Sequence, residues 1–183
     1  MSRMPSMQDE RLPPAVLLYE RRGLWHVALR SRWRESFADR GDVSAPSWIR
    51  FGRMAEIRRL ATQRPGSFFV LEVRPGWESN IAAEIAYLRR WHSESKVAAV
   101  SPRAKELEVF FREMGVAAVA DRVAFAGPLA AVIYGHFRAL PGHFVDPWAA
   151  AWDGIPWREF SSTAGNPILR HQEMTASKGE ETE

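Results

Sequence analysis

The stretch SFFVLEVRPGW (Ser67–Trp77) decides the fold that we expect for this chain. After Ser67, an apolar run extends to Val73 that only Glu72 interrupts, and Pro75-Gly76 follows it as a break. A strand without polar alternation is typical of a parallel sheet that is covered on both faces. Glu72 is the exception, and we interpret a carboxylate at the exit of such a strand as the rim of a chemical site.

Four further segments outside this stretch read as strands: Ala15–Glu20, Ser47–Phe51, Lys96–Ser101 and Val116–Arg122. The segments between and after the strands carry apolar residues at helical spacing. These expected helices lie within residues 21–41, 52–66, 77–92, 102–115 and 127–142. For the first of them, a hairpin that turns at Arg22-Gly23 is an alternative.

Two of the expected helices have well-marked apolar stripes at i, i+3, i+4 and i+7 spacing. The stripe of residues 102–115 comprises Leu107, Phe110, Phe111 and Met114, and Gly115 ends the helix. The stripe of residues 127–142 comprises Leu129, Val132, Ile133, Phe137 and Leu140. We expect each stripe to face the sheet.

Strands that alternate with helices through short turns predict parallel strands joined by right-handed crossovers. Five such units predict an α/β fold with a five-stranded, doubly wound parallel sheet, flavodoxin-like with strand order 2-1-3-4-5. Five units are too few for an eight-stranded barrel.

We expect this α/β domain to span residues 13–140, after a flexible N-terminus at residues 1–12. Residues 141–160 are expected to be a docking segment with a short helix in Asp146–Phe160, whose Trp148, Trp152 and Trp157 favour burial. This segment docks on its own domain or inserts into a partner, where tryptophan is a strong anchor. Residues 161–183 are polar and are expected to be disordered.

The composition of the chain excludes several classes of protein. Its 183 residues include no cysteine, which rules out disulfides, thiolate metal sites and a cysteine nucleophile. The expected location is the cytoplasm, because no signal-peptide pattern and no apolar run of membrane-spanning length are seen. The five histidines have no close metal spacing, and no nucleotide-binding glycine motif is present, so we expect neither a metal nor a cofactor.

Ligands of doubly wound folds bind beyond the carboxyl ends of the strands. At those ends this chain has Tyr19-Glu20, Glu72, Ser101 and Asp121-Arg122. The sequence therefore predicts a rim that combines carboxylates, a hydroxyl and a cation. A purely structural Glu72–Arg122 ion pair at the sheet edge is an alternative.

With these residues at the strand ends, the chain resembles the receiver domains of two-component response regulators. The resemblance covers residues 13–140 and is best from Ser67 to Leu140. It implies that Tyr19 and Glu20 take the place of the acidic pair and that Glu72 takes the place of the phosphoacceptor aspartate. It also implies that Ser101 matches the conserved hydroxyl of receivers and that Arg122 replaces their lysine.

The departures from the receiver pattern indicate a pseudo-receiver without phosphoryl chemistry. Tyr19 is a poor magnesium ligand, since Mg²⁺ prefers oxygen ligands such as carboxylates. Glu72 is one methylene longer than aspartate, and an error near 1 Å costs on the order of 10²-fold in rate. Arg122 presents a planar fork in place of a compact ammonium, and it can pair permanently with Glu72 or Glu20.

We therefore expect a non-catalytic signalling or regulatory module that binds a protein partner. The face of the fourth helix, fifth strand and fifth helix, residues 104–140, is the expected contact surface, and a homodimer through it is an alternative. A second alternative is a domain that is still phosphorylated or otherwise enzymatic. A third is nucleic-acid binding through the arginine-rich residues 21–64, although the tryptophans there fall on helix faces that need a core.

Overall fold

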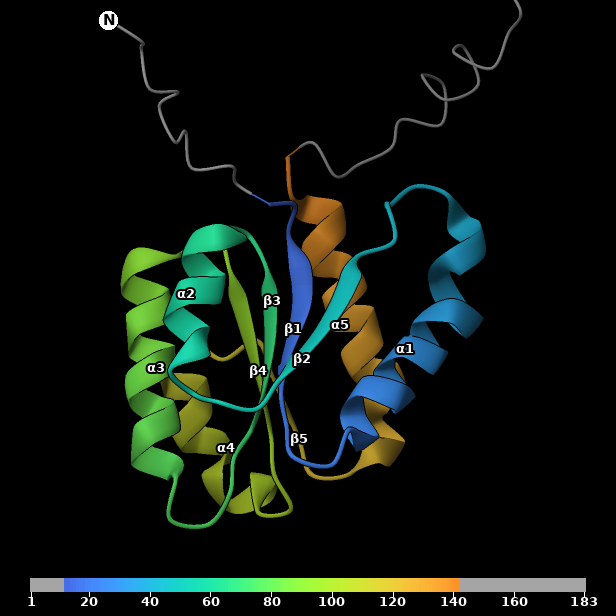
Figure 1. Ribbon diagram of the computed structural model, residues 1–183. Helices are drawn as coiled ribbons and strands as arrows, with labels where there is room; N and C mark the ends of the chain where they lie inside the picture. Colours follow the sequence, from blue (N-terminus) through green and yellow to red (C-terminus); the bar gives the residue numbers. More distant parts are fainter. Residues whose placement is uncertain (1–11, 142–183) are drawn as a thin grey trace, which may run out of the picture. The chain divides into compact units, whose positions relative to one another are not determined.

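A computed structural model of the chain describes residues 12–141, and these residues form a five-stranded parallel sheet (Figure 1). The strand order β2-β1-β3-β4-β5 confirms the doubly wound, flavodoxin-like arrangement that the sequence predicts. The strands are β1 (Ala15–Tyr19), β2 (Ser47–Phe51), β3 (Phe68–Glu72), β4 (Lys96–Val100) and β5 (Ala118–Ala120). All neighbouring strands pair in parallel, with Leu17 beside both Ile49 and Phe69.

Helices cover both faces of the sheet, as Figure 1 shows: α2, α3 and α4 lie on one face, and α1 and α5 lie on the other. Their bounds are α1 (Leu24–Phe37), α2 (Glu56–Gln63), α3 (Glu78–Trp91), α4 (Ala104–Glu113) and α5 (Ala126–Ala139). Short 3-10 turns, η1 (Ala38–Arg40) and η2 (Val123–Phe125), follow α1 and precede α5.

The sheet divides the core into two apolar clusters, because successive side chains of a strand point to opposite faces. Leu17 and Phe69 pack with α2 and α3, whereas Leu18 and Phe68 pack with α1 and α5. The tryptophans of the arginine-rich half belong to this core, since Trp25 and Trp33 are buried in the second cluster. This placement confirms the expectation that they serve packing.

The hairpin considered at Arg22-Gly23 is wrong, because the chain enters α1 directly after this turn. Gly23 precedes the helix with φ 78°, a conformation that glycine adopts without steric cost. A Cβ at Gly23 would also collide with the guanidinium of Arg50. The glycine therefore allows both the turn and the close approach of Arg50.

The sequence overestimates the apolar contacts near the edge of the sheet. Phe110 and Val132 are 41% and 37% exposed, so the stripes that bury Phe111, Ile133 and Phe137 are narrower than expected. The fifth strand is also shorter than residues 116–122, since β5 pairs with β4 alone. An edge strand gains backbone hydrogen bonds on one side only, which explains its three-residue length.

Two expectations about the ends of the chain lie outside the described residues. They are the flexible N-terminal segment and the tryptophan-rich helix with Trp148, Trp152 and Trp157, followed by the disordered tail. Within residues 12–141, no helix combines the length and the apolar character needed to span a bilayer.

Candidate functional site

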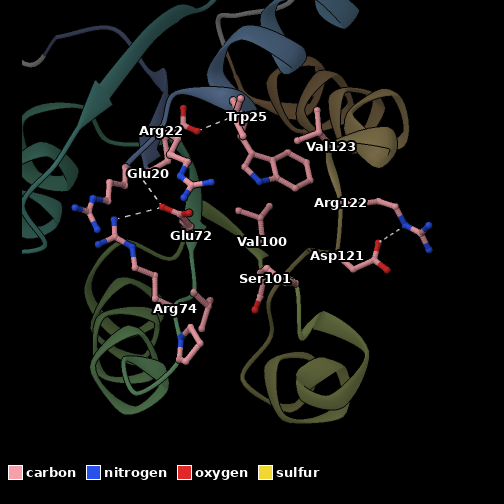
Figure 2. A pocket seen from close by; sticks show the side chains of 15 residues that line it. Glu20, Arg22, Trp25, Glu72, Arg74, Val100, Ser101, Asp121, Arg122 and Val123 are labelled. Carbon is pink, nitrogen blue, oxygen red and sulfur yellow. Dashed lines mark hydrogen bonds and ion pairs between the residues drawn. The ribbon is translucent and has the colours of Figure 1, made fainter.

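The carboxyl ends of β1, β3, β4 and β5 surround one pocket of about 520 Å³ (Figure 2). Glu20, Glu72, Ser101 and Arg122, which the sequence places at the rim, all line this pocket. The parallel sheet brings them together from four different strands, although they are far apart in the chain. Asp121 also lines the pocket.

Glu20 is buried and acts as the N-terminal cap of α1. Its Oε2 accepts a hydrogen bond of 3.0 Å from the backbone N–H of Trp25, and its Oε1 accepts one of 2.9 Å from that of His26. The first N–H groups of a helix have no partner within the helix, and a carboxylate there also interacts favourably with the helix dipole. Both oxygens of Glu20 are thus engaged by the fold itself.

Glu72 ties the end of β3 to the loop after β1. Its Oε2 accepts hydrogen bonds from the backbone N–H of Arg21 at 2.8 Å and from the Arg74 guanidinium at 3.3 Å. This geometry holds one oxygen of Glu72 against the protein. Within residues 12–141, Oε1 of Glu72 has no hydrogen-bond partner, and the side chain faces the pocket with Trp25 and Val100 (Figure 2).

Ser101 is buried at the end of β4, where its Oγ accepts a hydrogen bond of 3.1 Å from the backbone N–H of Arg103. This contact closes the turn that leads into α4 and is a typical local role for serine. The hydroxyl still has its own hydrogen to donate. Ser101 is therefore a pocket residue with one donor left over.

Arg122 lines the pocket but extends away from Glu72, as Figure 2 shows. Its Nε lies 3.2 Å from Oδ1 of Asp121, and its side chain is 63% exposed. The Glu72–Arg122 ion pair considered from the sequence is therefore wrong, because Glu72 pairs with Arg74 and Arg122 with Asp121. Glu72 and Arg122 each form an ion pair with a residue one or two positions away in the chain.

Tyr19 does not line the pocket. It is 3% exposed and belongs to the core cluster under α2 and α3, where its ring contacts Phe51 at 5.8 Å between centroids. The guanidinium of Arg74 lies 5.6 Å above the ring. The sequence placed Tyr19 beside Glu20 in the pocket, which is wrong because consecutive residues at a strand end point in opposite directions.

Arginines follow every strand at this edge of the sheet, whereas the rim expected from the sequence includes only Arg122 among them. Arg103 is fully paired, with Glu106 at 2.6 Å and Glu78 at 3.6 Å, and its hydrogen bond to Glu106 raises its pKa above the ordinary value. By contrast, the guanidinium groups of Arg21, Arg22 and Arg50 make no ion pair with any described residue. The rim therefore carries uncompensated positive charge.

A second hollow, of about 410 Å³, lies beside the first and was missed by the sequence analysis. Arg21, Arg50 and Arg74 line it together with Glu20 and the Phe51-Gly52 turn. Glu20, Arg21 and Arg74 form a wall common to both hollows. The available signal was the position of arginines directly at the ends of three predicted strands.

No group of three or more histidine or carboxylate side chains within residues 12–141 is arranged to hold a metal ion. Comparisons of the chain with protein-family models, with curated proteins and with solved structures found no match.

Proposed function

We propose that this chain is a non-catalytic, receiver-like interaction module of bacterial-type signalling or regulation that acts in the cytoplasm. The observation that carries the proposal is the state of Glu20, whose two carboxylate oxygens both accept backbone hydrogen bonds from α1. In the receiver pattern, this position supplies a metal ligand. Here the carboxylate is used for capping.

The remaining rim residues support the loss of phosphoryl transfer. Tyr19 is turned into the core, so the acidic pair of a receiver is reduced to one committed carboxylate. Mg²⁺ demands near-octahedral oxygen ligands at about 2.0–2.1 Å, which this set does not supply. Arg122, at the position of the receiver lysine, extends away from Glu72 and pairs with Asp121.

Exposed apolar side chains on α4 and directly before α5 support a role in protein contacts. Val109 and Phe110 of α4, together with Phe125 before α5, are 69%, 41% and 44% exposed. Exposed apolar side chains of this size are compatible with an interaction site. This surface falls within the face of α4, β5 and α5 that the resemblance to receivers indicates, and we propose a protein partner for it.

A phosphorylation assay tests the proposed loss of phosphoryl transfer. Incubation of the full chain with acetyl phosphate and Mg²⁺, followed by intact-mass measurement, should leave the mass unchanged. A receiver domain of known activity, treated under the same conditions, is the positive control. An added phosphoryl group on this chain would contradict the non-catalytic proposal.

Matched valine variants test the contact surface. Val109 of α4 and Val27 of α1 are 69% and 68% exposed, so Val109→Glu and Val27→Glu introduce the same charge at equally exposed positions. We expect a pull-down read by mass spectrometry to lose a specific protein with Val109→Glu and to keep it with Val27→Glu. Equal recovery by both variants would refute a contact through α4.

The same pull-down, performed with and without residues 144–160, examines the proposed role of the tryptophan-rich segment. Loss of the partner on deletion would assign the segment to the contact. Size-exclusion chromatography with light scattering distinguishes a homodimer from a complex with another protein. A dimer that dissociates with Val109→Glu would make a second copy of this chain the partner.

A further inference from the structure

Three arginines line the second hollow, and among the described residues only Arg74 has a carboxylate partner. Arg21 follows β1, Arg50 belongs to β2 and Arg74 follows β3, so the sheet order 2-1-3 places them side by side. The facing carboxylates are Glu20, which caps α1, and Glu72, which pairs with Arg74. Arg21 and Arg50 therefore have no charged partner within the described part of the chain.

Arg74 is partly buried and ion-paired, whereas Arg50 is exposed and lies beside the turn before α1. The guanidinium of Arg50 rests against Gly23, where a Cβ would not fit. The guanidinium of Arg74 lies over the ring of Tyr19, and its Nε is buried without a hydrogen-bond partner among the described residues. A buried donor without an acceptor is costly, which favours an anionic group that accepts from it.

The first hollow offers mostly apolar walls next to this charge. Leu24, Val73, Val100 and Val123 line it, and the indole of Trp25 faces the same space (Figure 2). Its volume of about 520 Å³ lies in the range of small-molecule pockets. Oε1 of Glu72 and the hydroxyl of Ser101 provide polar atoms at its edge.

We propose that the two hollows together form a reversible, metal-independent binding site for a phosphate ester that carries an aromatic ring. The phosphate lies between Arg21, Arg50 and Arg74, because planar guanidinium forks bind phosphate oxygens in pairs. The aromatic body lies against Trp25 and the valines of the first hollow. A nucleoside monophosphate combines a charged phosphate with a flat aromatic base that can pack against such walls.

This inference goes beyond the proposed function and does not depend on it. Phosphoryl transfer needs a metal and a nucleophilic carboxylate, whereas reversible binding needs only the arginines and the apolar walls. The two proposals also fail separately, since covalent phosphorylation is detected by mass and reversible binding by titration.

Isothermal titration calorimetry of the full chain in EDTA and low salt tests the site. The probes are AMP, phenyl phosphate, inorganic phosphate and adenosine. We expect AMP and phenyl phosphate to bind, inorganic phosphate to bind more weakly than either, and adenosine to give no measurable heat. Affinity for the esters should fall as salt is raised, because the contact is between exposed charges.

Arginine variants locate the phosphate. Arg50→Gln and Arg21→Gln should each weaken AMP binding by about tenfold or more, the typical effect of losing a charged hydrogen bond. Arg34→Gln removes the same charge from an exposed position in the last turn of α1 and should leave binding unchanged. Thermal melting of each variant checks that it remains folded.

Three results would overturn the proposal. One is the absence of binding by both esters. Another is inorganic phosphate that binds as tightly as AMP, which would leave no role for the apolar hollow. The third is AMP affinity that is equal in the wild-type chain and in the folded Arg50→Gln and Arg21→Gln variants.

Discussion

At the scale of single residues, the structure gives Glu20 a different role from the one that its place in the sequence indicates. At the end of a parallel strand this residue has the position of a ligand-binding carboxylate. The turn through Gly23 instead brings the start of α1 back over the carboxylate, which accepts two backbone hydrogen bonds. The N-cap residue of α1 is Gly23, which has no side chain that could accept these hydrogen bonds. Glu20 is therefore a structural residue that lines a pocket.

Replacing Glu20 by glutamine tests this role. An amide has a single acceptor oxygen, so Glu20→Gln leaves one helix N–H facing an NH₂ group. We expect the free energy of unfolding to fall by about 0.5–2 kcal/mol, the usual range for loss of a helix cap. Urea denaturation measures the change, and Glu94→Gln at an exposed position is the matched control. Equal stability of the two variants would contradict the capping role.

At the scale of elements, each helix is held mainly by its buried stripe and tolerates weak residues on its exposed side. α5 buries Leu129, Ile133 and Phe137 and contains Gly127 and Gly135, where an added Cβ would meet open space. Gly115, after α4, is a different case, since its φ is 76° and a Cβ would lie 2.7 Å from the Arg89 guanidinium. The same residue type is thus dispensable in α5 and required after α4.

Two alanine substitutions separate these cases. Gly135→Ala should raise the free energy of unfolding by about 0.5–1 kcal/mol, because alanine favours a helix interior over glycine. Gly115→Ala should lower it by about 1–2 kcal/mol, because a left-handed backbone strains any residue with a Cβ. Thermal or urea denaturation of both variants measures whether each substitution raises or lowers the free energy of unfolding. A Gly115→Ala variant that is more stable than the wild-type chain would contradict the strain expected at this turn.

At the scale of the whole molecule, the pleat of the strands divides the buried side chains of residues 12–141 into two clusters, one on each face of the sheet. Ile85 of α3 lies in one cluster and Ile133 of α5 in the other, and both are fully buried. Substitutions at distant sites without common partners usually add in free energy, whereas substitutions at neighbouring sites do not. The stability of the domain should therefore behave as the sum of its two faces.

A double-mutant cycle measures this separation. Ile85→Val and Ile133→Val should each cost about 0.5–1.5 kcal/mol, and the double variant should lose their sum within about 0.5 kcal/mol. Ile81→Val with Ile85→Val, on the same face of the sheet, is the comparison pair and should deviate more from additivity. Strong coupling across the sheet would show that the two cores repack together.

The sequence alone was sufficient for the order and type of the elements. Continuous apolar runs such as Phe68–Leu71 are typical of strands that are covered on both faces, and five strands alternating with helices leave few topologies. It was also sufficient to gather Glu20, Glu72, Ser101 and Arg122 at one edge, because parallel strands end on the same side. These conclusions need only periodicity and chain connectivity.

Only the tertiary structure decided what those side chains do. The direction of Tyr19, the capping by Glu20 and the pairing of Arg122 with Asp121 depend on turn geometry and on neighbours that are distant in the chain. The grouping of Arg21, Arg50 and Arg74 around one hollow likewise arises from strand order. The local pattern of apolar residues determines which helices and strands form. Hydrogen bonds and ion pairs act over short distances in space, so their partners are determined only when segments that are distant in the chain come together.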